Sequence, residues 1–239
     1  MANRNDGRRP DELRPVRITR GFIGSSAGSV LIEAGRTRVI CAVTIQDDVP
    51  PFLEGKGQGW VTAEYSMLPA STGSRKARDR YGKVDGRTLE IQRIVGRAMR
   101  TCVDMELIGE RTLWIDCDVI EADGGTRAAA ITGAYVAVAD AARRMVKDGM
   151  VLKSPVKRAV AAVSAGIVAG VPLLDLCYEE DSRAAADMNL AMGDDGKMVE
   201  VQCTAEKAAF GDETLQELLR LGKKGIQQLF EIQKAALGG

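Results

Sequence analysis

The segment Val119–Ala134 constrains the fold of this chain more than any other. It reads VIEADGGTRAAAITGA and passes from a strand-like run through two glycines into an alanine-rich stretch typical of a helix. Gly124 and Gly125 let backbone N–H groups approach a ligand, the first N–H groups of a helix lack intrahelical partners, and Arg127 adds a planar donor. The combination predicts an anion site that suits phosphate. The same residues also fit a plain tight turn in which Thr126 caps the helix.

Hydrophobic spacing on either side of this segment predicts alternating strands and helices. Period-two or continuous apolar patterns predict strands over 16–23, 29–33, 37–45, 60–68 and 111–121, opening as a meander. Helical spacing predicts an amphipathic helix over 88–107, with Arg93, Arg97 and Arg100 on its polar side, and a second helix over 126–146. The chain should therefore be an α/β (α+β) protein.

The rest of the chain repeats this plan more loosely. Strand-like segments cover 158–176 and 187–203, with a turn at 194–197, and a final amphipathic helix covers 213–236. The only plausible seam is 147–156, which contains a glycine and a proline. With 239 residues, 45% of them hydrophobic, the chain can form one large domain or two small ones. We expect one domain over 1–239 with approximate halves 1–146 and 156–239.

Composition excludes several kinds of chemistry. The chain has no histidine, which rules out Ser-His-Asp and Cys-His hydrolases and histidine-ligated zinc, so acid or base work falls to other side chains. A metal would be held by carboxylates and water, which suits Mg²⁺ or Mn²⁺. The 33 basic residues balance the 33 acidic residues, so binding to a nucleic acid would require a local basic patch.

Cellular location is predicted from what the sequence lacks. The first twenty residues contain arginines but no apolar run of a signal peptide, and the longest uncharged stretch, 159–174, is too short to cross a bilayer. The five cysteines are widely spaced and include no C-x-x-C pair, which indicates reduced core residues. We therefore expect a cytoplasmic protein without a membrane partner.

A basic segment over 71–87 is the second candidate for function. It holds six basic residues and two acidic ones, and these side chains can gather around a polyphosphate backbone, although a solvated loop is an equal alternative. Arg87 lies at the start of a helix, where the helix dipole favours anions. Arg87 and Arg127 could clamp one phosphate from two sides, unless Arg87 is an ordinary surface or ion-paired arginine.

An acidic segment over 174–189 is the third candidate. Asp187 begins a strand between apolar neighbours, whereas Glu179 and Glu180 look like exposed loop charges. Two carboxylates near a bound phosphate would hold a divalent cation, and one with a raised pKa could donate a proton to a leaving oxygen. Helix capping or ion pairing with Arg183 is the alternative for any single aspartate.

Seven ordered motifs show that nearly the whole chain resembles the ribonuclease PH family of bacteria, phosphate-dependent 3′-to-5′ exoribonucleases that trim tRNA precursors. They are DGRRPDELRP (6–15), GSVLI (28–32), GRTRVIC (35–41), GWVTAEYSMLP (59–69), GRTLEIQR (86–93), DVIEADGGTR (118–127) and DSRAAADMN (181–189). The resemblance implies the two-halved fold of ribosomal protein S5 domain 2 and a ring of six chains, a homo-hexamer built as a trimer of dimers.

The same resemblance implies residue roles. Inorganic phosphate, the co-substrate, would be held by Arg87, Gly125, Thr126 and Arg127. Asp181 and Asp187 would be the catalytic carboxylates, with Asp187 the first choice as proton donor. Mg²⁺, with Mn²⁺ possible, would bind at Asp181 or Asp187, and which of the two carboxylates holds the metal is left open. Arg75, Arg78 and Arg80 would bind RNA, including tRNA precursors. The implied reaction is phosphorolysis of RNA 3′ ends with release of nucleoside diphosphates, and the alternative is a catalytically silent RNA-binding ring subunit.

Overall fold

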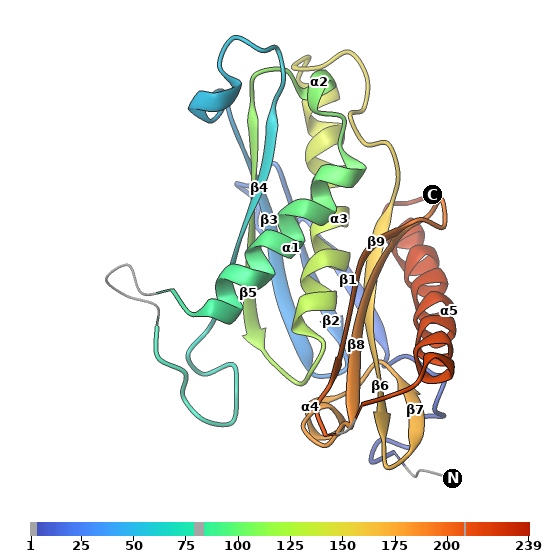
Figure 1. The fold of residues 1–239 in the computed structure, drawn as a ribbon. Coiled ribbons are helices and arrows are strands. Elements are labelled where there is room, and N and C mark those ends of the chain that lie inside the picture. The colour runs from blue at the N-terminus through green and yellow to red at the C-terminus, as the bar shows by residue number, and fades with distance from the viewer. Residues whose placement is uncertain (1–3, 79–83, 208) are drawn as a thin grey trace.

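The computed structural model describes residues 4–78, 84–207 and 209–239, and in these ranges two β-sheets pack with helices (Figure 1). The first sheet contains β1 (Val16–Arg20), β2 (Gly28–Ala34), β3 (Thr37–Gln46), β4 (Trp60–Met67) and β5 (Thr112–Glu121). The second contains β6 (Val160–Val168), β7 (Val171–Leu174), β8 (Ala186–Gly193) and β9 (Met198–Ala205). The helices are η1 (Pro51–Leu53), α1 (Gly86–Cys102), α2 (Met105–Ile108), α3 (Thr126–Lys147), α4 (Tyr178–Asp181) and α5 (Asp212–Ala236). The predicted mixed α/β class is confirmed.

The first sheet begins as the expected meander but does not continue as one. Its order is β1-β2-β3-β5-β4, and β5 pairs antiparallel with β3 and parallel with β4. A parallel pair requires a crossover, and α1 and α2 supply it between β4 and β5. The strand predicted at 60–68 therefore forms, but at the edge of the sheet and not next to β3.

Helix α1 covers this sheet with its apolar side and ends earlier than predicted. Its buried apolar residues follow the expected helical spacing, while Arg93 and Arg97 are exposed. Arg100 instead lies over the ring of Trp60, 4.6 Å from its centroid, and donates to the Val61 carbonyl. Asp104 accepts two backbone N–H groups and so starts α2 as a separate turn.

The second sheet is antiparallel, with the order β7-β6-β8-β9. Ala169 and Gly170, both with positive φ, divide the predicted 158–176 strand segment into β6 and β7. Helix α5 packs against β6, β7 and β8, which confirms the predicted final helix.

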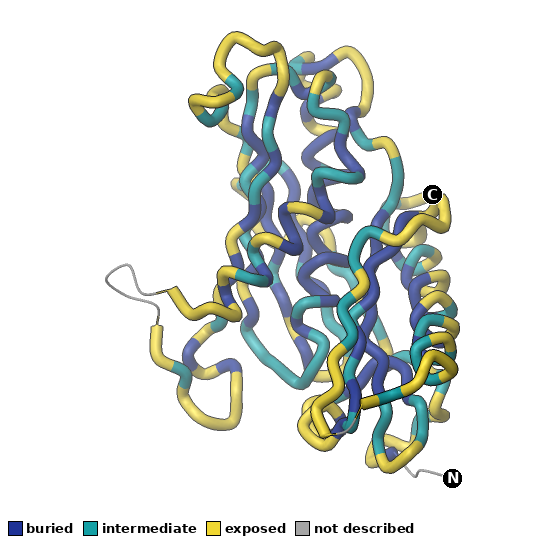
Figure 2. Tube along the Cα trace, viewed as in Figure 1, coloured by how far each residue is buried: buried dark blue, intermediate teal, exposed yellow. Residues whose placement is uncertain are grey.

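Helix α3 lies between the two sheets and is buried along most of its length (Figures 1 and 2). It contacts β2 and β3 on one side and β6 on the other. Its many alanines allow this close approach, and a Cβ at Gly133 would lie 2.8 Å from an Ile32 methyl carbon. Both sheets thus fix the position of the turn at the start of α3. In the described part of the chain, no helix is long and apolar enough to span a membrane.

Candidate active site

The turn between β5 and α3 has the form that its glycines require. Gly124 and Gly125 both have positive φ, 76° and 67°, which glycine adopts without steric cost. A Cβ at Gly124 would lie 2.6 Å from the Leu176 carbonyl oxygen. Thr126 does not cap the helix as the alternative supposed, because α3 begins at Thr126 with Gly125 as the N-cap and no side-chain cap bond. The first turn of α3 therefore presents N–H groups without a side-chain cap.

A polar pocket of about 200 Å³ opens in front of this turn. It brings together all the residues that were predicted to hold phosphate or to act as catalytic carboxylates. The lining residues are Arg87, Gly125, Thr126, Arg127, Ser164, Asp181, Asp187, Asn189, Gln202, Thr204 and Glu206. They come from the starts of α1 and α3, from the end of α4, from β6, and from β8 and β9 with the turn that follows β9.

Arg127 is the most constrained cation of the pocket. Its side chain is only 12% exposed, its Nη1 donates to the side-chain oxygen of Gln202, and its Nη2 lies 3.4 Å from a carboxylate oxygen of Glu90. Its Nε is buried and has no hydrogen-bond partner among the described residues. A buried unpaired donor is costly, so this N–H calls for an acceptor that the described residues do not supply.

The two aspartates of the pocket have raised pKa values. Burial raises the pKa of Asp187, and the negative charges of Asp181 and Glu206 raise it further. Burial also raises the pKa of Asp181, although the charges of Arg87 and Arg127 oppose the shift. Neither aspartate forms the ion pair with Arg183 that was the alternative. Arg183 is instead paired with Glu179, with 3.6 Å between its Nη2 and a carboxylate oxygen. These carboxyl groups therefore take up protons more readily than ordinary aspartates.

The two aspartates of the pocket suit a divalent cation that keeps part of its water shell. In the described ranges no cluster of three or more His, Cys, Asp or Glu side chains is arranged to hold a metal ion. Mg²⁺ does not need such a cluster, because it retains several waters and binds through one or two carboxylates together with substrate phosphates. The pair Asp181 and Asp187, facing a phosphate-sized polar pocket, fits that pattern.

Arg75 and Arg78, two of the three residues predicted to bind RNA, are not among the residues that line the pocket. Arg75 and Arg78 are exposed on the loop that projects from the body beside the start of α1 (Figure 1). Arg80 lies outside the described residues. Within this loop Lys76 pairs with Asp85, the residue before α1, at 3.2 Å.

Several residues of the site were missed from the sequence. Register pairs Asp187 with Thr204 and Asn189 with Gln202, so polar residues of β8 and β9 share one face. The alternation of polar and apolar residues from 186 to 190 and from 201 to 204 was the available signal. Glu90, which contacts Arg127, gave no such signal.

The prediction that Glu180 is an exposed loop charge is wrong. It is 8% exposed and accepts two hydrogen bonds from Arg4, at 2.8 and 2.7 Å, because α4 packs onto the N-terminal segment. The cysteines also depart in part from their prediction. Three are buried, whereas Cys177 and Cys203 are partly exposed.

Comparisons with known proteins agree with this architecture. Residues 12–144 match the model for the 3′ exoribonuclease family, domain 1, and residues 158–225 match the model for domain 2 of that family. Among solved structures, rice (Oryza sativa) Rrp46 aligns with a TM-score of 0.79 at 18% identity, over 98% of this chain and 100% of that one. A chain of the Archaeoglobus fulgidus exosome with RNA bound to the active site aligns with a TM-score of 0.82 at 23% identity, over 96% and 92%. A chain of an archaeal exosome core aligns with a TM-score of 0.77 at 22% identity, over 98% and 91%.

At these identities the structural matches establish the fold. The two family models together cover most of the chain, in the order of its two sheets. On this basis the chain belongs to the 3′ exoribonuclease family, the family of ribonuclease PH.

Proposed function

We propose that this protein is a phosphate-dependent 3′-to-5′ exoribonuclease of the bacterial ribonuclease PH type, which trims the 3′ ends of tRNA precursors and other RNAs. One observation carries the proposal: a pocket lined by Arg87, Arg127 and the Gly125–Thr126 turn also contains Asp181 and Asp187. An anion cradle next to two carboxyl groups of raised pKa suits phosphoryl transfer to inorganic phosphate.

The reaction follows from these groups. The free N–H groups at the start of α3 and the guanidinium groups of Arg87 and Arg127 bind inorganic phosphate and orient one of its oxygens. That oxygen attacks the phosphorus of the last phosphodiester of RNA. A new P–O bond forms, the bond to the 3′-oxygen breaks, and a nucleoside diphosphate departs. The leaving 3′-oxygen takes its proton from the carboxyl group of Asp187, whose raised pKa favours the protonated form.

A divalent cation would complete the charge balance. Asp181, or Asp187 once it has given up its proton, would hold Mg²⁺, with Mn²⁺ as the alternative, together with water and phosphate oxygens. When bound, the metal offsets negative charge on the reacting phosphates. The forward reaction exchanges a phosphodiester bond for a phosphoanhydride bond. The reverse reaction, attack of an RNA 3′-hydroxyl on a nucleoside diphosphate with release of inorganic phosphate, follows from the same site.

The larger setting is also part of the proposal. Arg75 and Arg78, together with Arg80, would contact the RNA backbone upstream of the 3′ end. The chains would assemble as a homo-hexamer in the cytoplasm, in line with the resemblance to ribonuclease PH and with the exosome proteins whose fold it shares.

A second candidate is an RNA-binding subunit of an exosome-like ring, because the solved structures with this fold include Rrp46 and exosome core chains. The pocket favours the enzyme over this candidate. A subunit that only binds RNA has no need for a buried, unpaired arginine donor next to two carboxyl groups.

One assay separates the two candidates. The protein is incubated with a tRNA bearing a short 3′ extension, with and without inorganic phosphate, and the released nucleotides are identified by mass. We expect nucleoside diphosphates that appear only when phosphate is present. Monophosphates released without phosphate contradict phosphorolysis, and RNA binding without release supports the ring subunit.

A further inference from the structure

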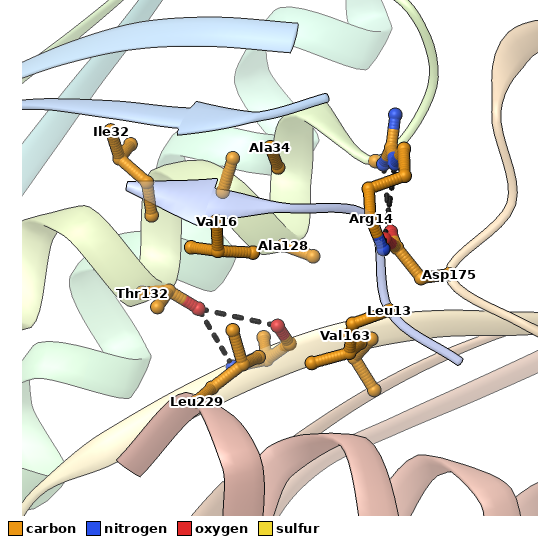
Figure 3. Close-up of a pocket in the computed structure, with 13 residues that line it drawn as sticks. Leu13, Arg14, Val16, Ile32, Ala34, Ala128, Thr132, Val163, Asp175 and Leu229 are labelled. Atoms are coloured by element: carbon orange, nitrogen blue, oxygen red, sulfur yellow. Dashed lines mark hydrogen bonds and ion pairs between the residues drawn. The ribbon is translucent and has the colours of Figure 1, made fainter. Parts of the chain in front are cut away.

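A buried ion pair between Arg14 and Asp175 (Figure 3) contacts the Gly124–Gly125 turn, and neither of its residues lines the polar pocket, although Gly125 does. Arg14 and Asp175 have side chains that are 4% and 9% exposed. One carboxylate oxygen of Asp175 accepts the backbone N–H and the Nε–H of Arg14, at 2.8 and 3.0 Å, and the other accepts Nη2 at 2.7 Å. The pairing is bidentate and therefore fixes the plane of the guanidinium.

The remaining N–H groups of Arg14 are directed at the turn. Nη1 donates to the carbonyl of Asp123 at 2.6 Å, and Nη2 lies 3.4 Å from the carbonyl of Gly124. The hydroxyl of Thr37 donates to the Gly124 carbonyl at 2.6 Å and accepts the N–H of Asp123 at 2.9 Å. Both carbonyls before the helix are thus held on the side of Arg14.

This arrangement decides where the N–H groups of the turn point. In a trans peptide the carbonyl and the following N–H point in opposite directions. When Arg14 and Thr37 hold the two carbonyls, the N–H groups of Gly124 and Gly125 point away from Arg14. A Cβ at Gly125 would lie 2.8 Å from the Nη2 of Arg14, so the guanidinium packs directly against the turn.

The same ion pair links the turn before α3 to the chain segment that carries Asp181. Asp175 belongs to the segment that follows β7, with a positive φ of 53°, and it leads into α4, which bears Asp181. Burial by itself would raise the pKa of Asp175, but the charge and hydrogen bonds of Arg14 hold it below the ordinary value, so the carboxylate remains ionised. Arg4 further ties this segment by donating to the carbonyls of Leu174 and Asp175, both at 2.9 Å.

We propose that Arg14, held by Asp175, is a positioning residue for phosphate binding: it fixes the 123–125 turn so that the N–H of Gly125, which lines the pocket, is presented to the phosphate, without itself contacting the phosphate. The inference rests on the proposed function, because it assigns phosphate to the pocket. Substitution of Arg14 should weaken phosphate binding and leave RNA binding unchanged.

The experiment compares Arg14→Lys with the wild type and with Arg20→Lys. Lysine retains the charge but cannot hold Asp175 and both carbonyls at once. Arg20 provides the matched control, because it forms a bidentate pair with Asp140, at 2.7 and 2.6 Å, that does not involve the turn. Circular dichroism first establishes that each variant is folded. Calorimetry with inorganic phosphate alone then gives Kd, and steady-state assays give KM for phosphate and for RNA.

We expect Arg14→Lys to raise the Kd and the KM for phosphate at least about tenfold, which is about 1.4 kcal/mol, with the KM for RNA unchanged. Arg20→Lys should change neither. A purely structural role would lower kcat through a smaller active fraction and leave both KM values as they are, and that result overturns the inference.

A second variant covers the case in which Arg14→Lys does not fold. Thr37→Val is nearly isosteric and removes the hydroxyl that donates to the Gly124 carbonyl and accepts the N–H of Asp123. We expect a phosphate Kd raised about threefold or more, and an unchanged Kd in a folded Thr37→Val contradicts positioning of this turn. If the wild type itself binds no phosphate, the proposed function fails along with the inference; if it binds and Arg14→Lys binds equally well, only the inference fails.

Discussion

Substitution of Gly124 by alanine tests whether the turn is packed as tightly as the structure indicates. The new Cβ costs free energy in two ways. A positive φ disfavours alanine by about 1–2 kcal/mol, and the Cβ would lie 2.6 Å from the Leu176 carbonyl oxygen and 2.8 Å from the Cys177 carbonyl carbon. These are backbone atoms and cannot rotate away, so overpacking adds about 1–3 kcal/mol. We therefore expect Gly124→Ala to lower the free energy of unfolding by about 2–5 kcal/mol.

Gly55→Ala provides the matched control. Gly55 also has a positive φ, 69°, but a Cβ there meets nothing within 4 Å. Only the backbone cost applies at Gly55, so the melting temperature should fall by about 2–8 °C for Gly55→Ala and by about 4–20 °C for Gly124→Ala. The assay is a thermal melt followed by circular dichroism at pH 7. Equal shifts for the two variants refute the argument, because they mean that the turn does not press on the segment after β7.

Three further predictions concern the carboxylates and the basic loop. Asp187→Asn should lower kcat by about 10²- to 10⁴-fold in a phosphorolysis assay. The pKa of Asp187 is raised in the folded protein, so the wild type loses stability as the pH rises above the unfolded value of 3.8. The variant should therefore melt at a higher temperature than the wild type at pH 7 and lose that advantage below about pH 4. Glu180→Gln, which breaks a buried pair, should cost about 3–5 kcal/mol in urea unfolding, whereas the exposed neighbour Glu179→Gln should cost less than about 0.5 kcal/mol. Removing the charges of Arg75 and Arg78 together should weaken binding of single-stranded RNA and leave the KM for phosphate unchanged. The slope of log K for RNA binding against log salt concentration, measured by fluorescence anisotropy, should become less steep by about 1.4. An unaltered slope excludes this loop from the RNA interface.

Local patterns in the sequence were sufficient to predict the turn and most of the secondary structure. The strand, the two glycines and the helix around Gly124 follow from conformational rules that act within a few residues. The apolar face of α1 and the final helix α5 were predicted for the same reason. Local rules allowed a phosphate clamp of Arg87 and Arg127 only as one of two alternatives. The grouping of both arginines with Asp181 and Asp187 came from the resemblance to a known family, and the pocket brings these residues together.

Features that depend on pairing between distant segments could not be predicted. The position of β4 beside β5 depends on the crossover through α1, and the face shared by Asp187 and Gln202 depends on the register of β8 and β9. Glu180 was misjudged because its environment is created by Arg4, 176 residues away. An isolated glutamate in a polar stretch carries no sign of such a partner.

The burial of α3 between the two sheets has a consequence for how the protein is made. The first sheet and α3 emerge from the ribosome before β6 and β8, yet Val160, Ala162 and Ala191 of these later strands belong to the same core cluster as α3. Until they arrive, the alanine-rich side of α3 that faces β6 has no cover, and the nascent chain exposes apolar surface. Completion of the second sheet is therefore the step that both closes the core and fixes the start of α3, so a chain truncated within the second sheet should be a client of chaperones and lack a formed phosphate pocket.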